Sequence, residues 1–225
     1  MNFDKNKFWE KKIIGWEHKR YCVGDSETPS GSDGDVSLGS SLQFRLRQSV
    51  ELLSPYLPGK SLLELGCGSG LLLKALSGSE MKKYTGIDWA SPAIEKAAAE
   101  FQNKPNLPPS EFVAGNLLDM EFPEFHLVVA LGVLDWLDLN EINILFSKIK
   151  PKKFLFSISE KRFSIKRWLH SIYVFLAYGW KNQGYVPRYY TVDEIVGIAH
   201  NHGYNDVRIF RDPRMSFGTF LYQLD

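Results

Sequence analysis

Short apolar runs alternate with stretches of helical periodicity along most of the chain. The run at 126–131 is almost wholly apolar, as expected for a central strand that is covered on both faces. A helix is predicted over 42–57, where apolar residues recur at helical spacing until Pro58 and Gly59 end the pattern. Strands are expected at 61–65, 83–88, 111–115, 126–131 and 154–159.

The last part of the chain continues this alternation. Thr191 and Glu194 are spaced as in a capping box that begins a helix, and Gly203 is suited to ending that helix. Two further apolar runs, 207–210 and 217–221, predict an antiparallel hairpin. Strands that alternate with helices favour an α/β fold built on a parallel sheet.

The segment 61–76 has the most specific pattern in the chain. An apolar run is followed by Gly66, Gly68 and Gly70 and then by a helical pattern, which predicts a strand, a tight turn and a helix. Glycines at such a turn let a ligand approach the backbone without an intervening Cβ. The spacing differs from the dinucleotide fingerprint G-x-G-x-x-G, because Leu71 stands where that pattern has its third glycine.

The sequence E-L-G-C-G-S-G at 64–70 resembles motif I of the class I S-adenosylmethionine (SAM)-dependent methyltransferases, and the later segments resemble the rest of that core in order. Over 42–225 the resemblance implies a doubly wound, seven-stranded, mostly parallel sheet with an antiparallel last strand and helices on both faces. It also implies SAM as cofactor and S-adenosylhomocysteine (SAH) as product. A carboxylate beside the turn suits a ligand with an ammonium and a sulfonium. The implied turn contacts are Glu64, Leu65, Gly66, Cys67, Gly68 and Gly70.

Asp88 ends the second expected strand, about 20 residues after the glycine turn, where a carboxylate accepts hydrogen bonds from ribose hydroxyls. That role is compatible with NAD as well as with SAM. The resemblance implies that the next side chain, Trp89, packs on the adenine. An alternative role for Asp88 is the N-cap of the helix that starts near Ser91-Pro92.

The adenine edge and the cofactor carboxylate have two candidates each. The resemblance implies an aspartate at the adenine amino group, but the aligned residue is Asn116, followed by Leu117, and Asp119 is the alternative. On the helix before the first strand, Arg45 or Arg47 could bind the cofactor carboxylate through its planar fork of donors. Leu131, at the end of the fourth strand, is a further expected cofactor contact.

The segment after the fourth strand indicates the class of acceptor. In the family, amino-directed nucleic-acid methyltransferases have an Asn/Asp-Pro-Pro-aromatic tetrad there, whereas this chain has L-G-V-L at 131–134. A Pro-Cys nucleophile of the cytosine-C5 type is also missing from the sequence. The segment L-G-V-L-D-W-L is closer to small-molecule methyltransferases, so we expect methylation of a small molecule at oxygen rather than nitrogen, and no nucleic-acid partner.

Residues 160–190 form an insertion that is expected to cap the substrate side of the sheet. Its basic and aromatic composition favours an acidic, aromatic or lipid-attached acceptor, with Arg188 and Tyr189 as candidate substrate contacts. The candidates for a general base are His18, Tyr21, Asp135, Tyr185 and Tyr190. A catalytically silent SAM-binding scaffold or regulator and a NAD-dependent oxidoreductase are the alternative functions.

Composition adds limits to these expectations. The 225 residues are expected to form one domain, and a net charge of +1 gives no general argument for nucleic acid or anionic membranes. Cys22 and Cys67 lack metal-site spacing, and neither a signal peptide nor a transmembrane run is evident, so we expect a cytoplasmic protein without a metal. Residues 1–23 suggest a short helix lying across another part of the protein, and packing of its aromatic residues on the core is the alternative role. The Gly, Ser and Asp content of 24–41 suggests a mobile loop, either a lid or a plain surface linker.

Overall fold

The computed structural model describes residues 4–21, 38–102, 104–162 and 185–225. Most of the predicted lid and most of the predicted cap insertion therefore lie outside the described residues. The prediction of a loop up to residue 41 is wrong at its end, because helix α2 already begins at Leu38. Its apolar residues pack on the sheet, and this burial favours the helix.

Seven strands of the described chain form one sheet in the order β3-β2-β1-β4-β5-β7-β6. Neighbouring strands are parallel except at β7, which runs antiparallel to both β5 and β6. This confirms the predicted sheet with its antiparallel last strand. The strands are β1 (Ser61–Leu65), β2 (Lys83–Asp88), β3 (Ser110–Ala114), β4 (Leu127–Leu131), β5 (Lys153–Ser159), β6 (Arg208–Arg211) and β7 (Gly218–Gln223).

The strand order reverses beside β1. The chain moves outward from β1 through β2 to β3, and then returns to β4 on the other side of β1 before it continues to β5. Leu65, at the end of β1, is paired with Ile87 of β2 and with Ala130 of β4. In open α/β sheets, ligands bind outside the carboxyl ends of the strands at such a reversal. The glycine turn begins at this point.

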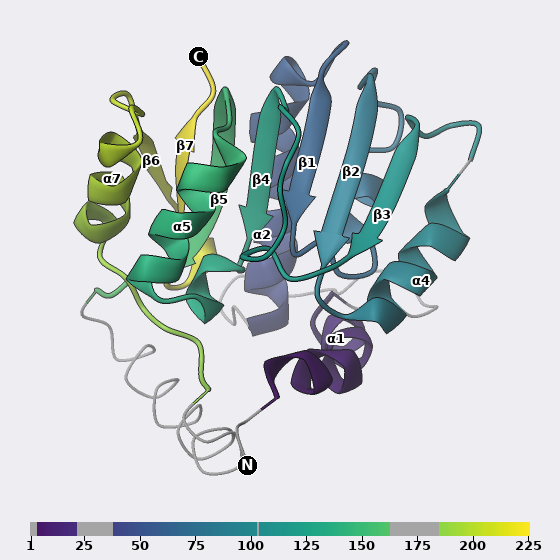
Figure 1. The fold of residues 1–225 in the computed structure, drawn as a ribbon, viewed down its shortest axis with the longest axis horizontal. Coiled ribbons are helices and arrows are strands. Elements are labelled where there is room, and N and C mark those ends of the chain that lie inside the picture. The colour runs from purple at the N-terminus through teal and green to yellow at the C-terminus, as the bar shows by residue number, and fades with distance from the viewer. Residues whose placement is uncertain (1–3, 22–37, 103, 163–184) are drawn as a thin grey trace.

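Helices cover both faces of the sheet (Figure 1). One buried cluster joins the sheet to α2 (Leu38–Leu53), α3 (Leu71–Ala75) and α4 (Ser91–Phe101). On the opposite face, a second cluster joins it to α5 (Leu139–Ile149) and α7 (Val192–Asn201). The central strands are apolar on both sides because both of their faces are buried in this way.

The two ends of α7 follow their sequence signals, whereas α2 ends earlier than its signal predicts. Thr191 is the N-cap of α7 and forms the predicted capping box with Glu194, while Gly203 follows the helix at φ +89°. The helix predicted over 42–57 ends earlier, at Leu53, and continues as a 3-10 turn at Ser54–Tyr56 that contains Pro55.

Within the described residues, no helix is both long enough and apolar enough to cross a membrane.

Helix α1 (Lys5–Tyr21) lies across the carboxyl ends of the strands, as the purple helix in Figure 1 shows. It contacts α2 and α4, and Ile13 packs against Ala90 and Ala93 at the start of α4. The predicted N-terminal helix across the core is therefore confirmed. Helix α1 therefore covers the edge of the sheet at which the glycine turn lies.

Candidate active site

The glycine turn wraps around the end of β2. The backbone N–H groups of Gly66 and Cys67 both donate to the carbonyl oxygen of Ile87, at 2.7 and 3.0 Å. Gly66 has a φ of +69°, and a Cβ at this position would lie 2.2 Å from Cγ2 of Val133. Glycine is required there both for the backbone conformation and for the close approach of the loop after β4.

The Asp88 carboxylate connects the glycine turn to the start of α4. Oδ2 accepts a hydrogen bond from the backbone N–H of Gly68 and Oδ1 accepts one from Ala90, both at 2.9 Å. The N-cap of α4 is Ala90, so the alternative that Asp88 is the N-cap is wrong. Burial raises the pKa of Asp88, and the backbone N–H groups partly counteract this effect.

Glu64 is buried, with 4% of its surface exposed. Its carboxylate accepts a hydrogen bond from the hydroxyl of Tyr84 on the neighbouring strand. Burial raises the pKa of Glu64 to about 8, and the nearby carboxylates of Glu17 and Asp88 add to this effect. Burial also raises the pKa of the Cys67 thiol, with Glu64 as the next contribution.

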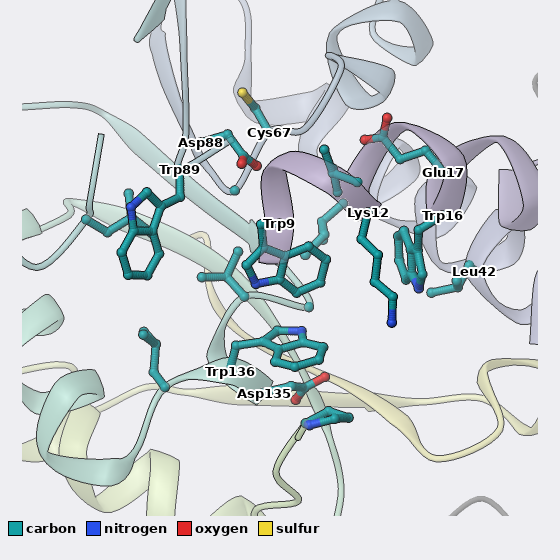
Figure 2. A pocket seen from close by; sticks show the side chains of 18 of the residues that line it. Trp9, Lys12, Trp16, Glu17, Leu42, Cys67, Asp88, Trp89, Asp135 and Trp136 are labelled. Atoms are coloured by element: carbon teal, nitrogen blue, oxygen red, sulfur yellow. The ribbon is translucent and has the colours of Figure 1, made fainter. Parts of the chain in front are cut away.

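A cavity of about 380 Å³ lies outside the glycine turn (Figure 2). Its lining brings together most of the predicted cofactor residues: Arg45, Glu64, Gly66, Cys67, Asp88, Trp89, Asn116, Leu117 and Leu131. The lining does not include Leu65, Gly68 or Gly70. Among the candidate bases, Tyr21, Asp135 and Tyr185 line the cavity.

The other candidates lie outside this lining. His18 is exposed on α1, and the Tyr190 hydroxyl donates to the carbonyl oxygen of Leu137. Arg188 is exposed, while the Tyr189 ring packs edge-on against Phe217 at 5.7 Å. None of these four side chains lines the described cavity.

Asn116 and Asp119 are hydrogen-bonded to each other. The Asn116 side-chain amide donates to Oδ2 of Asp119 at 2.7 Å, and its Oδ1 accepts from the backbone N–H of Leu118 at 3.2 Å. Asn116 lines the cavity, whereas Asp119 is exposed outside it. This arrangement favours Asn116 for the adenine edge, and Asp119 then orients its amide.

One face of α1 forms a wall of the cavity, and of its lining residues only Tyr21 was among the predicted site residues. Figure 2 shows Trp9, Lys12, Trp16 and Glu17 around the cavity. The signal was present in the sequence, because the lining residues of α1 recur three or four positions apart and so share one helix face. They are Lys5, Phe8, Trp9, Lys12, Ile13, Trp16, Glu17 and Tyr21.

Four aromatic side chains, which we call the aromatic box, pack together beside the cavity. They are Phe8, Trp9, Trp136 and Tyr185. The rings of Trp9 and Trp136 meet edge to face at 4.7 Å between centroids, and those of Trp136 and Tyr185 are 5.0 Å apart. The indole N–H of Trp9 donates to the hydroxyl of Tyr185 at 3.1 Å. This bond joins α1 to residues that follow β5.

Asp135 lies at the end of the sheet beside the aromatic box. Its carboxylate accepts hydrogen bonds from the backbone N–H and the hydroxyl of Ser159, at 2.7 and 2.8 Å. Burial raises the pKa of Asp135 to about 6, while the Ser159 N–H and the positive charge of Arg45 act in the opposite direction. Arg45 is itself buried, and its Nε has no hydrogen-bond partner in the described structure.

The charges around the cavity fit SAM better than a dinucleotide. Glu17, Glu64 and Asp88 interact electrostatically with one another and would repel a pyrophosphate. The same carboxylates suit an ammonium, a sulfonium and a ribose diol, while Arg45 suits a carboxylate. SAM contains all four of these groups.

Comparisons with known proteins agree with this fit. Residues 63–151 match the family model described as a methyltransferase domain. A solved magnesium protoporphyrin IX methyltransferase from Synechocystis PCC 6803, with bound SAH, is similar over 96% of both chains at 18% identity and a TM-score of 0.66. The same enzyme with bound SAM gives a TM-score of 0.63 at 18% identity, over 97% of this chain and 96% of that chain.

Two further similar structures have other partners or substrates in their names. A methyltransferase in complex with the Trm112 activator of Haloferax volcanii is 14% identical over 97% of this chain and 96% of that one, with a TM-score of 0.60. The small RNA methyltransferase HEN1 is 15% identical over 88% of this chain and 27% of its own length, with a TM-score of 0.64. The motif and the match over 63–151 therefore indicate a methyltransferase domain, and the fold of the chain is that of solved methyltransferases with bound SAM and SAH.

Proposed function

We propose that this methyltransferase transfers the SAM methyl group to an oxygen atom of a small aromatic acid. The observation that carries the proposal is the aromatic box beside the cofactor cavity. Its rings offer flat apolar surface, which stacks well on a planar acceptor. Its position beyond the end of β4 would present such an acceptor to the methionine end of the cofactor.

The size and cover of the cavity support a small acceptor. A volume of about 380 Å³ lies within the range of roughly 300–1,000 Å³ that is usual for small-molecule sites. Helix α1 lies over the carboxyl edge of the sheet and covers one side of the cavity (Figure 1). Closure of this kind also keeps water away from the reacting groups.

Positive charge at the aromatic box supports an acid and disfavours an amine. The Lys12 ammonium lies 4.7 Å from the centroid of the Phe8 ring. The ammonium of Lys5 lies 5.4 Å from the centroid of Tyr185, but it also pairs with Glu141 at 3.4 Å. The charge of Lys12 would attract a carboxylate and repel a protonated amine. A carboxylate also needs no general base. For a phenolic acceptor, Asp135 and Tyr185 are the candidate bases that line the cavity.

The cofactor residues have proposed roles that follow from their chemistry. Asp88 would accept hydrogen bonds from the ribose hydroxyls, and Arg45 would bind the carboxylate of the cofactor. Trp89 and Leu117 would pack on the adenine. SAM supplies an electrophilic methyl group whose C–S bond breaks as the new C–O bond forms. The protein's part is then to align the acceptor oxygen and to exclude water.

The experiment is a methyl-transfer assay with matched acceptors. Purified protein is incubated with SAM and with pairs of planar aromatic compounds that differ only in a carboxylate, hydroxyl or amine, and with a small RNA. Mass spectrometry locates the added methyl group. We expect methyl esters or ethers, and a Trp136→Leu variant should lose transfer while it still binds SAH.

A control variant lies on the same helix as part of the box. Ile14 is exposed on α1 and is absent from the cavity lining, so Ile14→Ala should keep both activities. Methylation of the amines or of RNA alone would contradict the proposal. SAH binding without transfer to any acceptor would favour the alternative of a catalytically silent SAM-binding protein.

A further inference from the structure

Glu17 of α1 reaches into the glycine turn from a part of the chain far from motif I. Its Oε1 accepts a hydrogen bond from the backbone N–H of Ser69 at 3.0 Å. The same oxygen lies 2.0 Å from where a Cβ on Gly68 would stand, so the carboxylate fills space that the glycine leaves open. Helix α1 is therefore attached directly to the turn that borders the cofactor cavity.

The second oxygen of this carboxylate has no partner. Glu17 is 6% exposed, and its Oε2 is buried without a hydrogen bond in the described structure. A buried carboxylate oxygen without a donor is unfavourable, because it has lost its hydrogen bonds to water. Because Glu17 also lines the cavity, a bound ligand can supply the missing donor.

The surroundings of Glu17 favour a cationic donor. Burial raises the pKa of Glu17, and the negative charge of Asp88 adds to this effect, while the Ser69 hydrogen bonds and Lys96 lower it in part. Glu64 is close enough for its own pKa to be raised by Glu17. A cation placed among these three carboxylates would be stabilised by all of them.

We propose that Glu17 binds the α-ammonium group of SAM and SAH through Oε2, and that this contact holds α1 and its half of the aromatic box against the sheet. Both ends of the helix take part because Trp9 and Glu17 lie on the same face. They are eight residues apart, which corresponds to about 12 Å along the helix axis. Cofactor binding at Glu17 thereby completes the aromatic box at the other end of the helix, where the acceptor would bind.

This linkage implies an order of binding. Without cofactor, α1 is retained by the Ser69 hydrogen bond and by its packing, and the buried Oε2 opposes that position. With cofactor, the same oxygen is paired and the closed position of α1 is favoured. The acceptor therefore binds after SAM. The part of the inference that concerns the acceptor rests on the proposed function, whereas the ammonium contact does not.

Calorimetry with three ligands tests the ammonium contact. SAH carries the ammonium and the carboxylate, decarboxylated SAH carries only the ammonium, and 5′-methylthioadenosine carries neither. In Glu17→Gln the amide oxygen can still accept from Ser69, so the fold is retained. Loss of a charged hydrogen bond should weaken SAH and decarboxylated SAH by about 10- to 100-fold and leave methylthioadenosine unchanged.

Two controls make the result specific. Glu10→Gln changes a carboxylate on the same helix that is absent from the cavity lining, and it should leave all three affinities unchanged. Arg45→Met should weaken SAH but not decarboxylated SAH. Equal weakening of methylthioadenosine by Glu17→Gln would overturn the proposal. Tighter SAH binding by the variant would also overturn it, because Glu17 would then occupy the cofactor's own place.

Hydrogen exchange tests the effect on α1. We expect SAH to slow amide exchange in 5–17 of the wild-type protein by at least several-fold more than methylthioadenosine does. In Glu17→Gln the two ligands should give the same protection. Equal exchange in 5–17 with either ligand in the wild-type protein would refute the link to α1. None of these measurements needs an acceptor, so they remain informative if the proposed acceptor class is wrong.

Discussion

The buried carboxylate of Glu64 predicts an unusual dependence of stability on pH. Its pKa is raised from the ordinary 4.5 to about 8, mainly by burial, and by the charges of Glu17 and Asp88, although the Tyr84 hydroxyl donates to it. Between these pH values the folded state keeps a proton that the unfolded chain has released. The free energy of unfolding must therefore fall as pH rises, by about 1.4 kcal/mol per pH unit. Over the whole window the upper bound is about 5 kcal/mol.

Glu64→Gln removes this proton equilibrium while it keeps a polar side chain of nearly the same size. Urea unfolding of the two proteins is followed by circular dichroism at half-unit steps from pH 5 to 9, without cofactor. The stability of the wild type relative to the variant should decrease steadily up to about pH 8 and then become constant, because Glu64 is then ionised in both states. Taking the difference at each pH removes the titration of groups that Glu64 does not influence.

Glu80→Gln serves as the control, because Glu80 is an exposed carboxylate just before β2. Its curve should run parallel to that of the wild type. A difference between the wild type and Glu64→Gln that stays constant from pH 5 to 9 would refute the reasoning. In that case the pKa of Glu64 in the folded state would lie at or below its ordinary value, contrary to the effect expected from its burial.

Three further substitutions test the fold. Gly70 has a φ of +81°, and a Cβ there would lie 2.9 Å from the Phe101 ring, so Gly70→Ala should cost about 1–3 kcal/mol in urea unfolding; an unchanged midpoint would show that the turn relaxes. Phe156 is fully buried between the sheet and α5. Phe156→Ala should lower the free energy of unfolding by about 3–5 kcal/mol in the same assay, and a smaller loss would indicate that the neighbouring side chains repack. Thr191→Ala should lower the free energy of unfolding by about 1 kcal/mol, because α7 loses its N-cap hydroxyl. Thr191→Ser keeps the hydroxyl and should be nearly neutral, and equal losses in the two variants would assign the effect to the methyl group.

Local patterns predicted the central sheet and the glycine turn well. Strand β2 has the predicted bounds, β5 begins one residue earlier than predicted, and β3 is shifted by one residue at both ends. Strands β2 and β5 are short and largely buried, so an apolar run with glycine or polar limits describes them well. The start of α2 was missed because Gly39 and the serines beside it suggest a loop, whereas tertiary packing decides the outcome.

The cavity wall on α1 could not be found from hydrophobic periodicity. Its inner face combines Trp9 and Trp16 with Lys12 and Glu17, so apolar and charged residues occur on the same side of the helix. A helix that packs on a core separates these classes, whereas a helix that faces a ligand does not need to. Asp88 was recognised because strand end and motif spacing fix its place, while Glu17 is linked to the turn only through the fold.

The hydrogen bond between Trp9 and Tyr185 spans 176 positions of the sequence. At a synthesis rate of about 5–20 residues per second, Trp9 is made some 9–35 seconds before that partner. The lining face of α1 carries two tryptophans and a phenylalanine, and for this interval it has no completed sheet edge to cover. The contacts of Trp9 with Trp136 and Tyr185 can therefore form only after residue 185 has been synthesised, although the partners of α1 in α2 and α4 are made earlier.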